Sequence, residues 1–142
     1  MSPAGTRPPS LAGKLGVKAG QRLLLVGAPA GWGVPGLPEG AVVLRGAREA
    51  GRADLVVAFF GERERLLSRA LALAEAVWPD GALWVAWPRR AGGHSSDLTD
   101  NNVRAALLPV GLVDVKVAVL DNDWSGLKFV WRKAVRAGKG AG

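Results

Sequence analysis

Three short runs of apolar residues constrain the fold of this chain more than any other feature of its sequence. The runs are RLLLVG at 22–27, ADLVVAFF at 53–60 and LWVAW at 83–87, and turn-forming residues bound them. A short continuous apolar run is typical of a strand that is covered on both faces, as in a parallel sheet. Residues 62–78 carry apolar side chains at helical spacing and precede Pro79, which predicts an amphipathic helix. Strands alternating with a helix indicate an α/β fold.

The remaining segments complete this α/β pattern. We expect a short helix capped by Ser10, a second strand at 41–45, and a further helix that begins after the N-cap residue Thr99. Valines alternate with other residues over 113–119, and the large apolar residues Leu127, Phe129 and Trp131 alternate with Lys128, Val130 and Arg132. This alternation predicts a β-hairpin that closes the domain, with the valines on its drier face.

The predicted architecture is a three-layer, Rossmann-like α/β fold with a mainly parallel sheet and a C-terminal antiparallel hairpin. A chain of 142 residues fits one domain, which we place at 11–133. A disordered arm is expected at 1–10 and a disordered basic tail at 134–142. In the amphipathic helix, Leu67 and Leu71 are predicted to face the core together with the other apolar residues.

Cysteine is absent from the chain, and histidine occurs once, as His94. Disulfide bonds, thiolate zinc sites and cysteine nucleophiles are therefore excluded, and one subunit cannot assemble a histidine cluster around a metal. No apolar run approaches the length of a membrane span, and the opening MSPAGTRPPS lacks the apolar core of a signal peptide. We therefore expect a cytoplasmic protein with no membrane partner and no metal.

The net charge of +7 is concentrated at the two ends of the chain. Residues 1–22 and 128–142 carry nine cationic side chains and no acidic one, so the segment between them is slightly acidic. Basic ends bind phosphate backbones through counterion release, which makes a nucleic-acid partner one hypothesis. The competing interpretation, which we rank above it, is that these ends are simply solvated.

Several motifs together resemble the class I S-adenosylmethionine-dependent methyltransferase fold. They are, in chain order, LLLVGAPAGWG, a strand opening with AD at 53–54, PDG at 79–81 leading into ALWVAWP, and GLVDV at 111–115 before the hairpin. The version here is shortened, because the room between Gly27 and Ala53 holds one short strand. More closely, KLGVKAG, LWVAWPRR, DLTDNNVR and WSGLKFVWRK resemble a small bacterial family known only as a domain of unknown function, which implies no activity.

The methyltransferase resemblance implies S-adenosylmethionine as the cofactor. In that fold the first strand carries an acidic residue before a glycine loop, and the second strand ends in an acid that binds the ribose hydroxyls. Here Leu25 stands at the first of these positions and Arg45 at the second. Pro29 replaces the middle glycine of the loop, whereas Gly27 and Gly31 remain. These three loop residues are the cofactor-binding candidates, and the missing acids favour a loop inherited without its ligand.

The segment 83–103 is the first candidate for a binding site, because ligands of open α/β sheets lie beyond the carboxyl ends of the strands. Arg89 and Arg90 follow such a strand and are predicted to hold a small anion, helped by the N–H groups of the helix after Thr99. Trp87 would supply a stacking wall. Further candidates in this segment are Pro88, Ser96 and Asp97. The alternative is structural: packing tryptophans, solvated arginines and capping polar residues.

The turn cluster 121–126 is the second candidate. Trp124 in a hairpin turn is costly to leave in water, so it is predicted to pack on a neighbouring loop, on a protein partner, or on a second copy of the chain in a homodimer. Ser125 and Lys128 would belong to the same surface. The simpler alternative is that Trp124 covers an edge of its own domain.

Three functional hypotheses follow from these observations. The leading one is a non-catalytic binding or interaction module, on a degenerate methyltransferase-like scaffold, that takes a small anion or a protein partner. The second is a small enzyme that binds S-adenosylmethionine or a nucleotide, and the third is a nucleic-acid accessory protein that uses its basic ends. No Ser/His/Asp arrangement, carboxylate pair or phosphate loop can be assembled from the sequence, so no catalytic residue is assigned.

Overall fold

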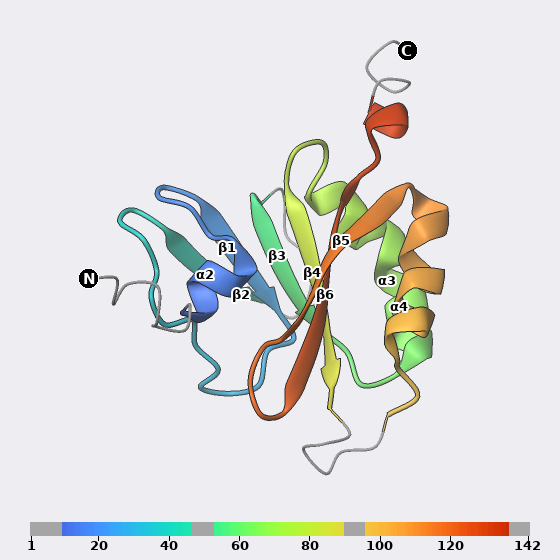
Figure 1. Ribbon diagram of the computed structural model, residues 1–142, viewed down its shortest axis with the longest axis horizontal. Helices are drawn as coiled ribbons and strands as arrows, with labels where there is room; N and C mark the ends of the chain where they lie inside the picture. Colours follow the sequence, from blue (N-terminus) through green and yellow to red (C-terminus); the bar gives the residue numbers. More distant parts are fainter. Residues whose placement is uncertain (1–9, 47–52, 90–95, 137–142) are drawn as a thin grey trace, which may run out of the picture.

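The computed structural model describes residues 10–46, 53–89 and 96–136, and these form a six-stranded sheet with helices on both faces (Figure 1). The elements, in chain order, are α2 (Leu11–Leu15), β1 (Arg22–Val26), β2 (Val42–Gly46), β3 (Leu55–Phe59), α3 (Arg63–Ala76), β4 (Ala82–Pro88), α4 (Asp100–Leu107), the 3₁₀ turn η2 (Leu108–Val110), β5 (Leu112–Val119) and β6 (Trp124–Trp131). The strand order is β2-β1-β3-β4-β6-β5, and β6 runs antiparallel to both of its neighbours. The predicted α/β fold, mainly parallel with a C-terminal hairpin, is confirmed.

Both faces of the central strands are covered, which explains the continuous apolar runs in the sequence. On one face, α3 and α4 pack side by side and contribute buried side chains such as Leu73 and Val103 (Figure 1). On the other face, α2 and the loop after β1 contribute Leu15 and Trp32. All five residues of β3, which lies between the two layers, are buried.

The connection from β1 to β2 contains no helix, although the two strands are parallel neighbours. A crossover between parallel strands usually carries a helix that covers the sheet. Here the indole of Trp32 covers the sheet instead, because its ring packs edge-on against Phe59 with the ring centroids 4.8 Å apart. This part of the sheet is therefore covered by a loop side chain and not by a helix.

The helix caps form at the residues that the sequence predicted, whereas one face of α3 is more exposed than predicted. The side chains of Ser10 and Thr99 accept hydrogen bonds from the backbone N–H groups three residues later, as predicted. Leu67 and Leu71 were expected to face the core but are 48% and 57% exposed. The prediction was wrong because α3 rests on the sheet through a narrower stripe that includes Leu66, and no described element covers the flank beyond it.

The end of the hairpin also differs from expectation. Trp124, predicted in the turn, is the first residue of β6, so the turn is confined to the residues before it. Residues 133–136 form a further helical turn, and Arg136 pairs with Asp80 at 3.3 Å. The rest of the predicted arm and tail, 1–9 and 137–142, lies outside the described residues. Among the helices that are described, none is long and apolar enough to cross a membrane.

Candidate functional site

The glycine loop after β1 has the shape that the sequence suggested. Gly27 takes a φ of 69°, which a residue with a side chain rarely adopts, and its N–H donates to the carbonyl of Gly46 at 3.0 Å. An added Cβ would also lie 3.3 Å from the Phe59 carbonyl oxygen. Glycine is therefore needed here to turn the chain tightly over the ends of β2 and β3.

The described side chains around this loop do not match those that the methyltransferase resemblance implies. An open pocket of about 660 Å³ lies at the ends of β1 and β2, and its lining residues are Leu25, Gly27, Ala28, Pro29, Ala30, Gly31, Arg45 and Gly46. No carboxylate is among these residues. Leu25 is 1% exposed and belongs to the core, and the Arg45 guanidinium donates to the carbonyl of Trp32. The described residues therefore do not fit S-adenosylmethionine in the way that the resemblance implies, because none of the described side chains that line the pocket would accept hydrogen bonds from the ribose hydroxyls.

Aromatic side chains connect the glycine loop to the hairpin. Phe59 packs edge-on between Trp32 and Trp124, with centroid distances of 4.8 and 4.9 Å. The Trp32 indole nitrogen also donates to Asp121 in the β5–β6 turn. The partner of Trp124 is thus a core residue of its own chain, which agrees with the simpler of the two sequence interpretations.

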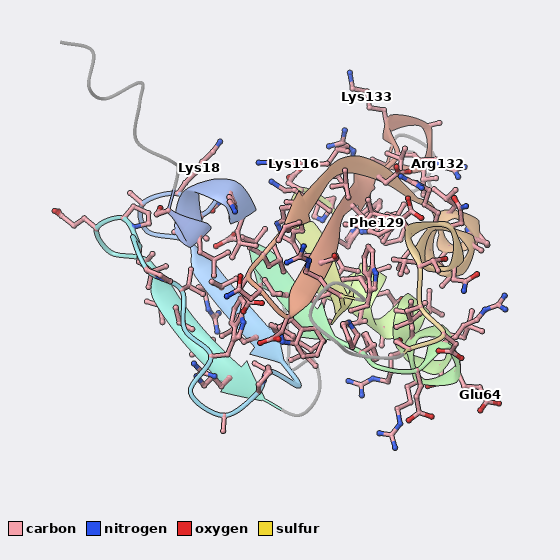
Figure 2. The ribbon with its side chains drawn as sticks, turned by 60° about the horizontal axis from the view of Figure 1, so that its bottom comes forward. Lys18, Glu64, Lys116, Phe129, Arg132 and Lys133 are labelled. Atoms are coloured by element: carbon pink, nitrogen blue, oxygen red, sulfur yellow. The ribbon has the colours of Figure 1, made fainter. Side chains whose placement is uncertain are left out.

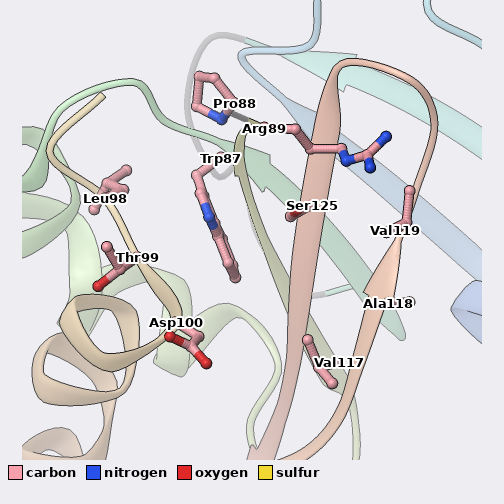
Figure 3. Close-up of a pocket in the computed structure, with 10 residues that line it drawn as sticks. All are labelled: Trp87, Pro88, Arg89, Leu98, Thr99, Asp100, Val117, Ala118, Val119 and Ser125. Atoms are coloured by element: carbon pink, nitrogen blue, oxygen red, sulfur yellow. The ribbon is translucent and has the colours of Figure 1, made fainter. Parts of the chain in front are cut away.

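A second open pocket, of about 590 Å³, lies between the start of α4 and the β5–β6 hairpin (Figure 3). Its lining residues are Trp87, Pro88, Arg89, Leu98, Thr99, Asp100, Val117, Ala118, Val119 and Ser125. The structure therefore brings five of the predicted site residues to one place, namely Trp87, Pro88, Arg89, Thr99 and Ser125. Figure 3 shows the Trp87 ring between the start of α4 and β6, with Asp100 and Val117 nearby.

Arg89 is directed at the hairpin turn. Its backbone N–H donates to the carbonyl of Asp123 at 2.8 Å, and its Nη1 donates to the carbonyls of Asp121 and Asn122, both at 3.3 Å. The side chain therefore holds the turn against the end of β4. Arg90, the other predicted anion ligand, lies outside the described residues.

The helix terminus at this pocket is already occupied by polar groups of the chain. The Thr99 hydroxyl accepts from the N–H of Asn102 at 3.2 Å, and the Asp100 carboxylate accepts from the N–H of Asn101 at 2.9 Å. The carboxylate also lies 3.4 Å from Arg104 Nη1. Because a carboxylate stands at the N-terminal end of α4, this wall of the pocket suits a cationic or neutral group better than the anion expected from the sequence.

The remaining predicted residues lie elsewhere. Ser96 donates to the carbonyl of Gly61 at 2.8 Å, and Asp97 accepts from the N–H of Arg63 at 2.9 Å, so both fasten the segment before α4 to the start of α3. Lys128 lies on the opposite face of the sheet from α4, where its Nζ is 6.0 Å from the centroid of the Trp84 ring. Among the described residues, no group of three acidic or histidine side chains could hold a metal ion.

Sequence reasoning missed the exposure of the valines on β5, two of which line the pocket. Val115, Val117 and Val119 were predicted on the drier face of the hairpin, yet they are 54%, 61% and 45% exposed. They lie on β5, which is the edge strand of the sheet, and no described helix covers them. The alternation of valines identified the strand but did not indicate that its apolar side is exposed to solvent.

Three solved structures are similar to this one over most of their length. A SAM-dependent methyltransferase from Aquifex aeolicus has a TM-score of 0.57 at 14% identity, over 84% of this chain and 86% of that chain. The Methanococcus jannaschii fibrillarin pre-rRNA processing protein has a TM-score of 0.54 at 13% identity, over 88% of this chain and 70% of that chain. The CcbJ methyltransferase from Streptomyces caelestis has a TM-score of 0.54 at 12% identity, over 85% of this chain and 86% of that chain. The fold is methyltransferase-like. No family model and no curated protein matches the sequence.

Proposed function

We propose that this chain is a non-catalytic binding module on a methyltransferase-like scaffold, and that it docks an extended segment of a protein partner along the free edge of β5. The observation that carries the proposal is the row of exposed valines on an edge strand beside a pocket. The closer resemblance to the small bacterial family of unknown function is part of this proposal and adds no activity to it.

The free edge of β5 supplies the first part of the docking surface. Among the described strands β5 lies at the end of the sheet and pairs with β6 alone. The backbone N–H and C=O groups on its outer edge are therefore available to an added strand, except the carbonyl of Val119, which accepts a hydrogen bond from Lys14 Nζ at 3.1 Å. In this mode of recognition the main chain supplies hydrogen bonds, and alternate side chains of the added segment enter pockets beside the edge strand.

The pocket supplies the second part. Val117 and Val119 form its near wall, Trp87 lies between them and α4, and Leu98 and Asp100 lie on the helix side. We call these five residues the β5 groove. Apolar side chains of the partner would bury against the valines and the Trp87 ring. A lysine or arginine of the partner, two residues along the segment from such an apolar side chain, would approach the Asp100 carboxylate. The groove therefore favours a segment that alternates apolar and basic residues.

Selection from a displayed library of random peptides tests this proposal. The full chain should enrich peptides with alternating apolar residues and at least one lysine or arginine, and their binding should shift the backbone NMR signals of 115–119 and of Asp100. Val117→Lys should abolish the binding. Val42→Lys is the matched control, because Val42 is 48% exposed on the other edge strand, β2, and it should leave the binding unchanged.

Three results would overturn the docking proposal. The first is no enrichment of any peptide, and the second is equal loss of binding in the two variants. The third is a dimer of the chain that Val117→Lys dissociates, because a second copy would then cover the groove in place of a partner.

A small S-adenosylmethionine-dependent enzyme is the second candidate function. The tight turn at Gly27 and the open pocket at the ends of β1 and β2 favour it. Calorimetry of the full chain with S-adenosylmethionine and with its demethylated product separates the two candidates. We expect no heat of binding, because none of the described residues that line the pocket carries a carboxylate. Micromolar binding of either compound would overturn the non-catalytic assignment.

A further inference from the structure

Four lysines from distant parts of the sequence meet where α2 packs on the hairpin. They are Lys14 and Lys18, in and just after α2, with Lys116 on β5 and Lys128 on β6. Lys116 Nζ donates to the carbonyl of Lys14 at 3.0 Å, and Lys14 Nζ donates to the carbonyl of Val119 at 3.1 Å. We call these four side chains the lysine face. Figure 2 shows Lys18 and Lys116 on the same side of the molecule.

Lys128 is the most enclosed member of the lysine face. Its ammonium lies close to the end of α2, where an added Cβ on Gly16 would stand 2.7 Å from Nζ. Burial lowers the pKa of Lys128 below the ordinary value of 10.5, and the positive charges of Lys116 and Lys18 lower it further. The fold therefore holds several cations close enough to repel one another.

No carboxylate balances these charges in the part of the chain that the structure describes. Ion pairs in these described residues join arginines to acids, such as Arg65 to Glu62, Arg104 to Asp100 and Asp114, and Arg136 to Asp80. None of the four lysines has a carboxylate oxygen within 4.0 Å in the described ranges. The ammonium groups of Lys14 and Lys116 donate to backbone carbonyls instead, so no carboxylate of the described residues neutralises the lysine face.

We propose that the lysine face binds the phosphate backbone of a nucleic acid. The lysines line none of the pockets described above, so the charge is spread over an open surface instead of being gathered in a cavity that would hold one phosphate. An open array of ammonium groups suits a polymer with regularly spaced phosphates, and the release of condensed counterions drives the association.

The surroundings of the lysine face also indicate which parts of the nucleic acid would be contacted. Trp84, the aromatic ring beneath Lys128, is fully buried and offers no surface on which a base could stack. Contacts would therefore go to phosphates, and binding would not depend on base sequence. Lys116 points toward α2, whereas the adjacent Val117 points toward α4, so a nucleic acid and the segment proposed for the β5 groove would occupy opposite faces of the sheet.

Fluorescence anisotropy with a fluorescein-labelled duplex DNA of mixed sequence tests the inference, using the full chain at low ionic strength. The triple variant Lys14→Gln, Lys18→Gln, Lys116→Gln should weaken binding by about tenfold or more, and the slope of log K against log salt should fall by about 2 to 3. Glutamine keeps a side-chain donor for the carbonyl contacts. Lys18→Gln alone, at an exposed residue with no described side-chain hydrogen bond, should weaken binding by about two- to threefold.

The matched control is Arg63→Gln, Arg65→Gln, Arg69→Gln on α3, which removes the same charge from the other side of the sheet. The dissociation constant of this variant for the duplex should lie within about twofold of that of the unaltered chain, because contacts outside the lysine face contribute little. Equal weakening in both triple variants would overturn the inference, since net charge alone would then account for binding. It would also be overturned if the duplex did not bind while vesicles containing phosphatidylserine did, because the anionic partner would then be a membrane surface.

Discussion

The indole nitrogen of Trp32 donates to a carboxylate oxygen of Asp121 at 2.9 Å, which ties the loop after β1 to a turn 89 residues later in the chain. The other carboxylate oxygen of Asp121 accepts from the N–H groups of Asp123 and Trp124 at 2.8 and 2.9 Å. One side chain therefore shapes the hairpin turn and holds the loop that replaces a crossover helix.

Replacement of Trp32 tests how much this loop contributes to stability. Trp32→Ala should lower the free energy of unfolding by about 3 kcal/mol or more, since the ring is 9% exposed and packs on Phe59. Trp32→Phe keeps most of the apolar packing, loses the hydrogen bond to Asp121, and should cost about 1 kcal/mol for that bond. Denaturant unfolding measures both. A loss below about 1 kcal/mol for Trp32→Ala would contradict an anchored loop.

Asp114 should make stability dependent on acid pH. The hydrogen bond from Arg104, at 2.9 Å, lowers the pKa of the Asp114 carboxyl below its ordinary value of 3.8, although burial opposes this effect. The unfolded chain therefore takes up this proton first, so the stabilisation is complete above pH 3.8 and is lost as the pH falls through the lowered pKa. Asp114→Asn should reduce the melting temperature at neutral pH, and the difference from the unaltered chain should vanish in acid.

Asp80→Asn is the control for the acid experiment. Asp80 also pairs with an arginine, but its side chain is 83% exposed, so the substitution should change the melting temperature little at any pH. Equal effects of the two substitutions would contradict a special role for the Arg104–Asp114 pair.

Lys128 should make stability dependent on alkaline pH, where this cationic side chain titrates. Its pKa is lowered in the folded state, first by burial and then by Lys116 and Lys18. Between the lowered pKa and 10.5 the unfolded chain binds more protons than the folded one, so stability rises with pH across that window. Lys128→Met keeps the packing and removes the charge, and its melting temperature should lack this rise. A rise of the same size in the variant would contradict the assignment.

Gly126 should tolerate no side chain. An added Cβ would lie 3.0 Å from both Leu120 and Trp84, which are buried beneath β6. Gly126→Ala should therefore lower the free energy of unfolding by about 1 to 3 kcal/mol through overpacking. Gly33→Ala is the matched control, because an added Cβ there meets no atom within 4 Å and the residue has no positive φ. The control should unfold within about 0.5 kcal/mol of the unaltered chain.

Local signals in the sequence predicted the fold, and side chains distant in the sequence decided the site. The apolar runs and the Thr99 cap depend on neighbours a few residues away, so the sheet and the start of α4 could be foreseen. The direction of Arg89 could not, because the carbonyls that bind it belong to a turn more than 30 residues later. The exposure of Val117 depends on where β5 lies in the sheet, and alternation alone does not say whether an apolar face is covered.

The shift in register between Asp114 and Lys116 limits what the edge of β5 can recognise. A bulge breaks the regular spacing of donors and acceptors, so the uninterrupted part of the edge begins at Lys116 and ends at Val119. Four residues at about 3.3 Å each give a contact of about 13 Å, enough for a short linear motif and too little for a folded domain. Such a contact dissociates quickly, so a stable complex would need a second tether on the same partner.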